Sequence, residues 1–240
     1  IEVLRGAAPA TYGATSFVGV IEVFKRSAED KTRSLLVSGG SYGSYAASYR
    51  MPLPQWAGVQ SALSLDAGKV GYKVDRTEVE RGHLLWKNSV AAGKGQFRFD
   101  VDGLWQRQDP SSPIPRVGTE LTPLVPIDSN ENPGGSYLNE SRYALNLTYR
   151  RPAMKGTWTS LFSATQSSQE VLRGFLVDVS TVNPNAVGFR QDIPVTDLYL
   201  DSHVSFPLAK QLNLVTGVDY LYGDGKVERV RLTRIHLEED

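Results

Sequence analysis

Apolar and polar residues alternate along most of this 240-residue chain, and this period of two is the feature that most limits its fold. Gln96–Arg107 would place charged and amide side chains on one face and Phe97, Phe99, Val101, Gly103 and Trp105 on the other. Arg142–Arg150 repeats the pattern with Tyr143, Leu145, Leu147 and Tyr149. Almost no stretch after Lys31 has the helical spacing of apolar residues. The chain is therefore predicted to be nearly all β.

The connections between the predicted strands alternate between tight and long. The tight ones are expected at Pro52–Gln55, Ala92–Gly95, Pro152–Lys155 and Pro207–Lys210, and the long ones at Val74–Gly82, Gln108–Glu140 and Gln169–Val195. Transmembrane barrels have short turns on one side, long loops on the other, and strands of about ten residues. This register predicts about nine such strands. Aromatic residues at strand ends would then lie at the membrane interfaces: Trp56, Tyr149, Trp158, Phe206 and Tyr222.

Composition excludes several classes of protein. The 26 basic and 26 acidic residues give a net charge of zero, which offers no general attraction to nucleic acid. No apolar run approaches the roughly 18 residues of a spanning helix. There is no cysteine, which excludes disulfides and thiolate metal sites, and no cofactor is expected.

The first tenth of the chain carries a glycine-rich pattern between two short apolar stretches. Arg5-Gly6 ends the first stretch, Tyr12-Gly13 lies in the middle, and Gly19 begins the second. This pattern resembles the end of the plug domain in TonB-dependent outer-membrane receptors. The resemblance implies the end of a plug domain over residues 1–26, a linker over 27–30, and the N-terminal portion of a transmembrane barrel over 31–240.

The implied fold is all-β, a partial transmembrane antiparallel barrel that forms an open curved sheet with the C-terminal piece of a plug against its polar side. The implied function is energy-coupled uptake of a scarce nutrient across a bacterial outer membrane, with a ferric siderophore as the first expectation and haem, cobalamin or a saccharide left open. The implied partners are that nutrient, outer-membrane lipid, and the inner-membrane TonB complex, reached through an N-terminal segment that this sequence does not include.

The resemblance also implies site residues. Arg5 would pair with barrel glutamates and hold the plug in the lumen, and Gly6, Tyr12, Gly13 and Gly19 would belong to the same contact. The nutrient would bind loops Gln108–Glu140 and Gln169–Val195.

Other candidate chemistry is weaker. Asp128, Asn130 and Asn132 begin like a calcium loop, but Pro133 replaces its glycine and Asn139 its final glutamate, which favours a surface loop. Asp197, Asp201 and His203 share a predicted strand face that is expected to be a polar lumen wall. The three histidines are scattered and no nucleophile elbow is present, so no enzyme is predicted.

Two alternatives remain. A soluble extracellular β-sandwich could bind carbohydrate or protein through the same long loops, and an esterase-like β enzyme would need a clustered nucleophile and base. A sandwich would bring Phe97, Leu145 and Leu214 together in a dry core, whereas a barrel would leave all three on its outer face.

Overall fold

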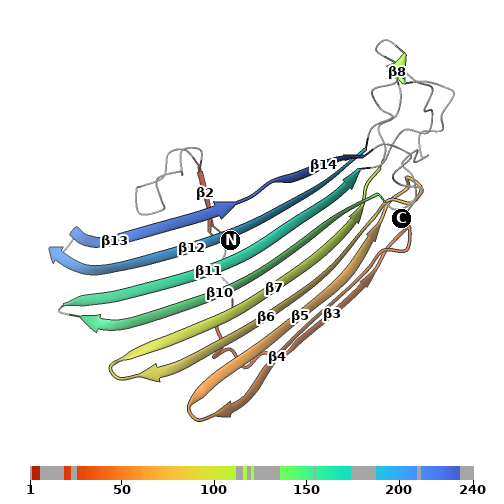
Figure 1. Cartoon of the computed structure of the whole chain (residues 1–240). Helices are drawn as coiled ribbons and strands as arrows, with labels where there is room; N and C mark the ends of the chain where they lie inside the picture. The colour runs from red at the N-terminus through yellow and green to blue at the C-terminus, as the bar shows by residue number, and fades with distance from the viewer. Residues whose placement is uncertain are drawn as a thin grey trace.

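The computed structural model describes residues 2–5, 19–22, 26–111, 116–117, 120–121, 136–153, 155–173, 188–209 and 212–232, almost all of them in antiparallel strands. The main sheet has ten strands, in the spatial order β13-β12-β11-β10-β7-β6-β5-β4-β3, with β14 also paired to β12 (Figure 1). No helix in the described residues is long and apolar enough to cross a membrane. The predictions of an all-β fold and of an open antiparallel sheet are confirmed.

The strands of the main sheet are long. Their bounds are β3 Ser34–Gly39, β4 Tyr45–Trp56, β5 Val59–Gly71, β6 Glu78–Ala92, β7 Gly95–Asp109, β10 Tyr137–Ala153, β11 Gly156–Arg173, β12 Gly188–Ala209, β13 Leu212–Gly225 and β14 Glu228–Leu232. Two small hairpins complete the described elements: β1 Glu2–Arg5 with β2 Gly19–Glu22, and β8 Arg116–Val117 with β9 Glu120–Leu121. Because β14 follows β13 along the same partner strand, the two act as one edge strand of the sheet.

Tight turns gather at one end of the sheet and the longer connections at the other, as predicted (Figure 1). The β4–β5 turn has Ala57 and Gly58 at φ 49° and 81°, the left-handed backbone of the hairpin turns that suit twisted strands. The β6–β7 turn uses Gly93 at φ 61°. At the opposite end, β7 and β10 are joined through residues 110–136.

One predicted turn is wrong. Pro52 and Pro54 lie inside β4, and the chain turns only after Trp56. The reason is that β3 pairs only with Tyr45–Arg50, so the rest of β4 has β5 on one side alone. An edge position tolerates a residue without a backbone N–H. The predicted long connections are also shorter than expected, because β6 begins at Glu78, β10 at Tyr137 and β12 at Gly188, while β11 extends to Arg173.

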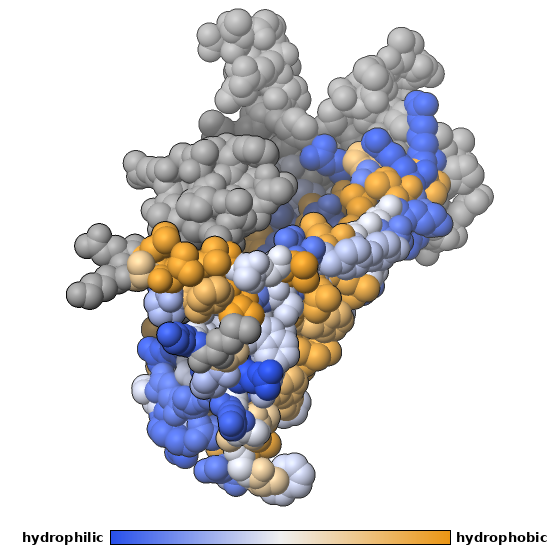
Figure 2. Space-filling model, turned by 90° about the vertical axis from the view of Figure 1, so that its left-hand side faces the viewer, coloured by the Kyte–Doolittle hydropathy of each residue, from blue (hydrophilic) through white to orange (hydrophobic). Residues whose placement is uncertain are grey.

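The two faces of the sheet differ in chemistry. Phe97, Leu145 and Leu214 belong to one face through the cross-strand register, and this face stays open: Leu145 is 38% and Leu214 41% exposed. Among the described residues, the only buried hydrophobic side chains are Ala28 and Ala62. Figure 2 shows hydrophobic residues along one flank of the sheet and hydrophilic residues along the other. The dry centre that a β-sandwich requires is therefore not found in the described part of the chain.

Candidate functional site

Four aromatic residues near the long-loop end of the apolar face form an oblique line, called here the upper aromatic line: Tyr45 of β4, Trp105 of β7, Tyr143 of β10 and Tyr222 of β13. Residues that are directly paired from strand to strand form a row across the sheet. Tyr45 is in the row of Arg107 and Tyr222 is in the row of Val101, so the two rows are six residues apart on β7. The line thus moves about 20 Å along the strands while it crosses about 34 Å of sheet, an angle of about 30°. Strands of transmembrane barrels tilt by about 35–45°, close to this angle.

A second set of aromatics on the same face, the lower aromatic line, lies near the tight turns: Phe97, Tyr149, Trp158 and Phe206. Phe97 is directly opposite Tyr149, whose ring packs edge-on against Trp158 with centroids 5.9 Å apart. Trp158 and Phe206 lie progressively nearer the turns, so this line slants as the upper one does. The eight positions from Phe97 to Trp105 span about 27 Å along the strand, or about 23 Å after the tilt is applied. Apolar bands of transmembrane barrels are about 25 Å tall.

Charged residues appear on the same face as soon as the strands pass the upper aromatic line. Lys69 contacts Glu78 at 2.5 Å, Arg190 contacts Glu170 at 3.0 Å, and Arg107 contacts Asp109 at 3.1 Å. These pairs are partly exposed, so they contribute little to stability. Their position shows that the apolar band has a sharp border.

The opposite face carries a charged row at the centre of the sheet. His83 Nδ1 is 3.2 Å from Asp66 Oδ2, and its Nε2 is 3.4 Å from Asp102 Oδ1. Asp102 is only 5% exposed, and the same oxygen is 3.6 Å from Arg142 Nη2. The four side chains come from β5, β6, β7 and β10, so the row joins four strands. A face of this kind suits contact with water or with a polar protein segment, not with hydrocarbon.

Further along this face, Asp201 contacts His203 at 2.6 Å and lies directly opposite Asp219. The predicted strand face of Asp197, Asp201 and His203 is therefore present on the polar side. Among the residues that the structure describes, no group of three or more histidine, cysteine or acidic side chains is arranged to hold a metal.

A segment that precedes β3, Arg26–Thr32, lies on the polar face and is called here the docked segment. Arg50 donates hydrogen bonds to three of its carbonyl oxygens, those of Ser27 at 2.8 Å, Thr32 at 3.1 Å and Asp30 at 3.3 Å. Arg50 is 8% exposed and Ala28 is 5% exposed. The docked segment therefore covers part of the polar face of β4.

The docked segment also contacts β6 and β7. Lys87 donates to the carbonyl of Arg26 at 2.7 Å, Ser89 donates to Glu29 at 3.1 Å, and Gln96 also donates to Glu29. Hydrogen bonds from Thr32 to the Asp30 carboxylate hold the pKa of Asp30 below its usual value. Residues 27–30, predicted as a linker, thus have specific partners on three strands.

The predicted plug residues are only partly within the described chain. Arg5 and Gly19 are cross-strand partners in the β1–β2 pair, which joins the two predicted apolar stretches. Gly6, Tyr12 and Gly13 lie outside the described residues, and so do Asp128, Asn130 and Asn132.

Sequence reasoning missed Arg50, His83 and Asp102 as members of connected polar sites. Alternation did place Asp102 on the polar face. The missing information was which strands are neighbours, because each of these contacts joins residues at least 17 positions apart.

The chain matches no protein-family model and no curated protein. Among solved structures, it is similar to the siderophore receptor PiuA from Acinetobacter baumannii, with a TM-score of 0.69 and 14% sequence identity. The match covers 95% of this chain and 35% of that receptor, so the chain spans about a third of the length of the protein it resembles. The chain therefore shares the fold of part of that receptor, present here as an open antiparallel sheet.

Proposed function

We propose that this chain is part of a TonB-dependent outer-membrane receptor that takes up a scarce nutrient, a ferric siderophore in the first instance. The observation that carries the proposal is the apolar band between the two oblique aromatic lines, about 23 Å tall, on a face whose reverse side is charged. Nutrient transport is supported by the fold shared with a siderophore receptor. In this proposal residues 1–26 end the plug, 27–30 link it, and 31–240 begin the barrel.

The docked segment supports the same assignment. A plug that enters a barrel must meet the polar wall, and residues 26–32 already lie against that wall through Arg50, Lys87 and Ser89. Arg5 and the glycines near it would extend this contact further into the lumen. Ligand would bind at the long-loop end, through loops Gln108–Glu140 and Gln169–Val195.

Membrane insertion is tested with single cysteines in the product of the complete gene, after any cysteine outside this chain has been replaced by serine; the chain itself has none. Leu145→Cys and Asn146→Cys are a matched pair, adjacent on β10 but on opposite faces. In isolated outer membranes, Leu145→Cys should resist a water-soluble maleimide and react with a lipid-soluble one, and Asn146→Cys should do the reverse. Equal reactivity of both positions with the water-soluble reagent would contradict membrane insertion.

Transport is tested by uptake of radiolabelled ferric siderophores into cells that express the gene as their sole receptor. We expect uptake that stops when TonB is deleted or when the proton gradient is collapsed. Uptake that persists in the TonB-deficient strain would contradict energy coupling, and binding of haem or cobalamin in place of siderophore would revise only the substrate.

A further inference from the structure

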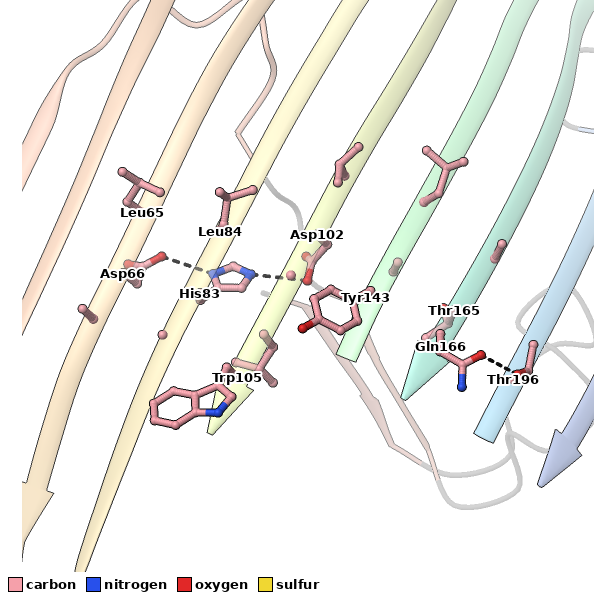
Figure 3. A pocket seen from close by; sticks show the side chains of 18 of the residues that line it. Leu65, Asp66, His83, Leu84, Asp102, Trp105, Tyr143, Thr165, Gln166 and Thr196 are labelled. Carbon is pink, nitrogen blue, oxygen red and sulfur yellow. Dashed lines mark hydrogen bonds and ion pairs between the residues drawn. The ribbon is translucent and has the colours of Figure 1, made fainter. Parts of the chain in front are cut away.

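The apolar face contains a hollow of about 990 Å³ that extends over seven strands (Figure 3). Its floor is made by small residues, among them Gly82, Gly103 and Ala164, and its walls include Leu65, Trp105 and Tyr143. A Cβ atom built on Gly82 would meet nothing within 4 Å, which shows that the floor is open. Asp66, His83 and Asp102 also border the hollow, but they occupy alternate positions whose side chains belong to the polar face.

One row of directly paired residues follows the hollow across the sheet: Thr196, Gln166, Tyr143, Gly103, Leu84, Leu65 and Tyr49. Thr196 lies two residues closer to the loops than Leu198, which is paired with Tyr222 of the upper aromatic line. Tyr49, by contrast, lies four residues closer to the turns than Tyr45 of that line. The row therefore descends about 20 Å along the strands, or about 17 Å perpendicular to a bilayer. It starts at the level of the upper interface and ends deep in the apolar band.

The two ends of the hollow differ in polarity. At the interface end, the Thr196 hydroxyl donates a hydrogen bond to Gln166 Oε1 at 2.6 Å, and the exposed Gln166 amide nitrogen is a further donor. The remaining members of the row are aliphatic, aromatic or glycine. A polar end at the interface followed by an apolar path into the bilayer has the same order of groups as a fatty acyl chain with its carbonyl linkage.

We propose that this hollow binds one acyl chain of a membrane lipid, with the carbonyl of its linkage beside Gln166 and its methylene groups over Gly103, Leu84 and Leu65. This inference rests on the proposed membrane insertion. Entry of the acyl chain into the hollow gives little hydrophobic gain, because the acyl chain leaves hydrocarbon for an equally apolar surface. The preference must come from packing and one hydrogen bond, and one such bond in a membrane is worth about a threefold change in affinity.

The test uses tryptophan quenching by lipids with brominated acyl chains. The complete gene product is refolded into phosphatidylcholine vesicles after every tryptophan except Trp105 has been changed to phenylalanine. A second protein retains only Trp158, which lies on the lower aromatic line outside the hollow. Titration of brominated diester lipid against an ordinary diether lipid, which lacks the carbonyl groups, gives the association constant of the carbonyl-bearing lipid relative to the ether lipid beside each indole. We expect a constant about threefold higher at Trp105 than at Trp158.

Two variants locate the effect. Gly82→Leu fills the floor and should reduce the Trp105 constant to that of Trp158. Val218→Leu enlarges a residue of the same face outside the hollow and should change nothing. If Gly82→Leu does not assemble, Gln166→Leu tests the same site, since it removes the polar end, leaves the floor intact, and should also abolish the preference.

Quenching of Trp105 no stronger than that of Trp158, or unaffected by both Gly82→Leu and Gln166→Leu, would overturn the inference while membrane insertion stands. The inference would also be overturned if a second copy of the protein covered the hollow and shielded Trp105 from lipid. Cross-linking in the vesicles would then show a dimer. Absence of quenching at both tryptophans would instead overturn the proposed function.

Discussion

Replacement of Arg50 by methionine should release the docked segment from the polar face and leave the sheet assembled. Its guanidinium donates to three backbone carbonyls, at 2.8, 3.1 and 3.3 Å, from a side chain that is almost fully buried. A hydrogen bond from a charged donor contributes about 1.5–3 kcal/mol. The three are not additive, because water hydrates the carbonyls once the segment opens. We therefore expect the free energy of opening of the docked segment to fall by about 3 kcal/mol, which raises the equilibrium constant for opening by a factor of about 150.

Cysteine labelling measures this opening directly, because the sequence contains no cysteine. Ala28→Cys introduces a thiol at a position that is 5% exposed in the docked segment. Its reaction with a water-soluble maleimide in detergent micelles should be slow in the parent protein and about 150-fold faster with Arg50→Met. Lys87→Met removes one hydrogen bond to the segment that is exposed to water and therefore worth only about 1 kcal/mol, so it should give about a fivefold increase.

Arg142→Met is the matched control, since this arginine of the same face contacts Asp102. It should leave the labelling rate of Ala28→Cys unchanged. A rate that rises equally in Arg142→Met and Arg50→Met would refute the local argument, because it would mean that any lost arginine loosens the sheet. A rate that stays within about twofold of the parent in Arg50→Met would show that the three hydrogen bonds do not hold the segment.

Leu145→Arg, at the centre of the apolar band, should destabilise the folded protein in a bilayer by about 2–4 kcal/mol, whereas Asn146→Arg on the polar face should change the free energy of unfolding by less than about 1 kcal/mol; urea titration in vesicles compares them. Gly217→Ala should prevent or weaken assembly of β13 on β12, because the added Cβ would lie 2.4 Å from a backbone oxygen of β12; heat-modifiable gel migration reports the loss. Because hydrogen bonds from Thr32 lower the pKa of Asp30, they stabilise the docked segment fully above its unfolded pKa of about 4 and are lost as the pH falls through the lower folded value. Labelling of Ala28→Cys should therefore accelerate in acid relative to the intrinsic thiol rate, and Asp30→Asn should remove that dependence.

Alternation of residue type was sufficient to predict the strands and both faces of the sheet. Phe97 and Leu145 were assigned to one face on this basis, and the register confirms it. The local signal succeeds because successive side chains of any strand point to opposite sides, whatever its neighbours are. Two glycine-containing turns near Gly58 and Gly93 also follow from local backbone requirements, although the first was placed too early.

Features that depend on neighbouring strands could not be predicted. The prolines of β4 indicated a turn, because the sequence around them does not show that β3 pairs with only the first part of β4. Arg50 gave no sign that it would bind carbonyls about 20 residues away, since a long basic side chain on a polar face is ordinarily solvated. The slant of the aromatic lines likewise needs the register of eight strands before it can be recognised.

The two margins of the sheet decide how this chain must be handled in the laboratory. Along β3 on one side, and along β13 with β14 on the other, amide and carbonyl groups point outward with no neighbouring strand in the described structure. In hydrocarbon each such group costs several kcal/mol, and in water it offers a template for another chain. The polypeptide made alone should therefore accumulate as aggregates, and in the proposed receptor both margins must pair with further strands.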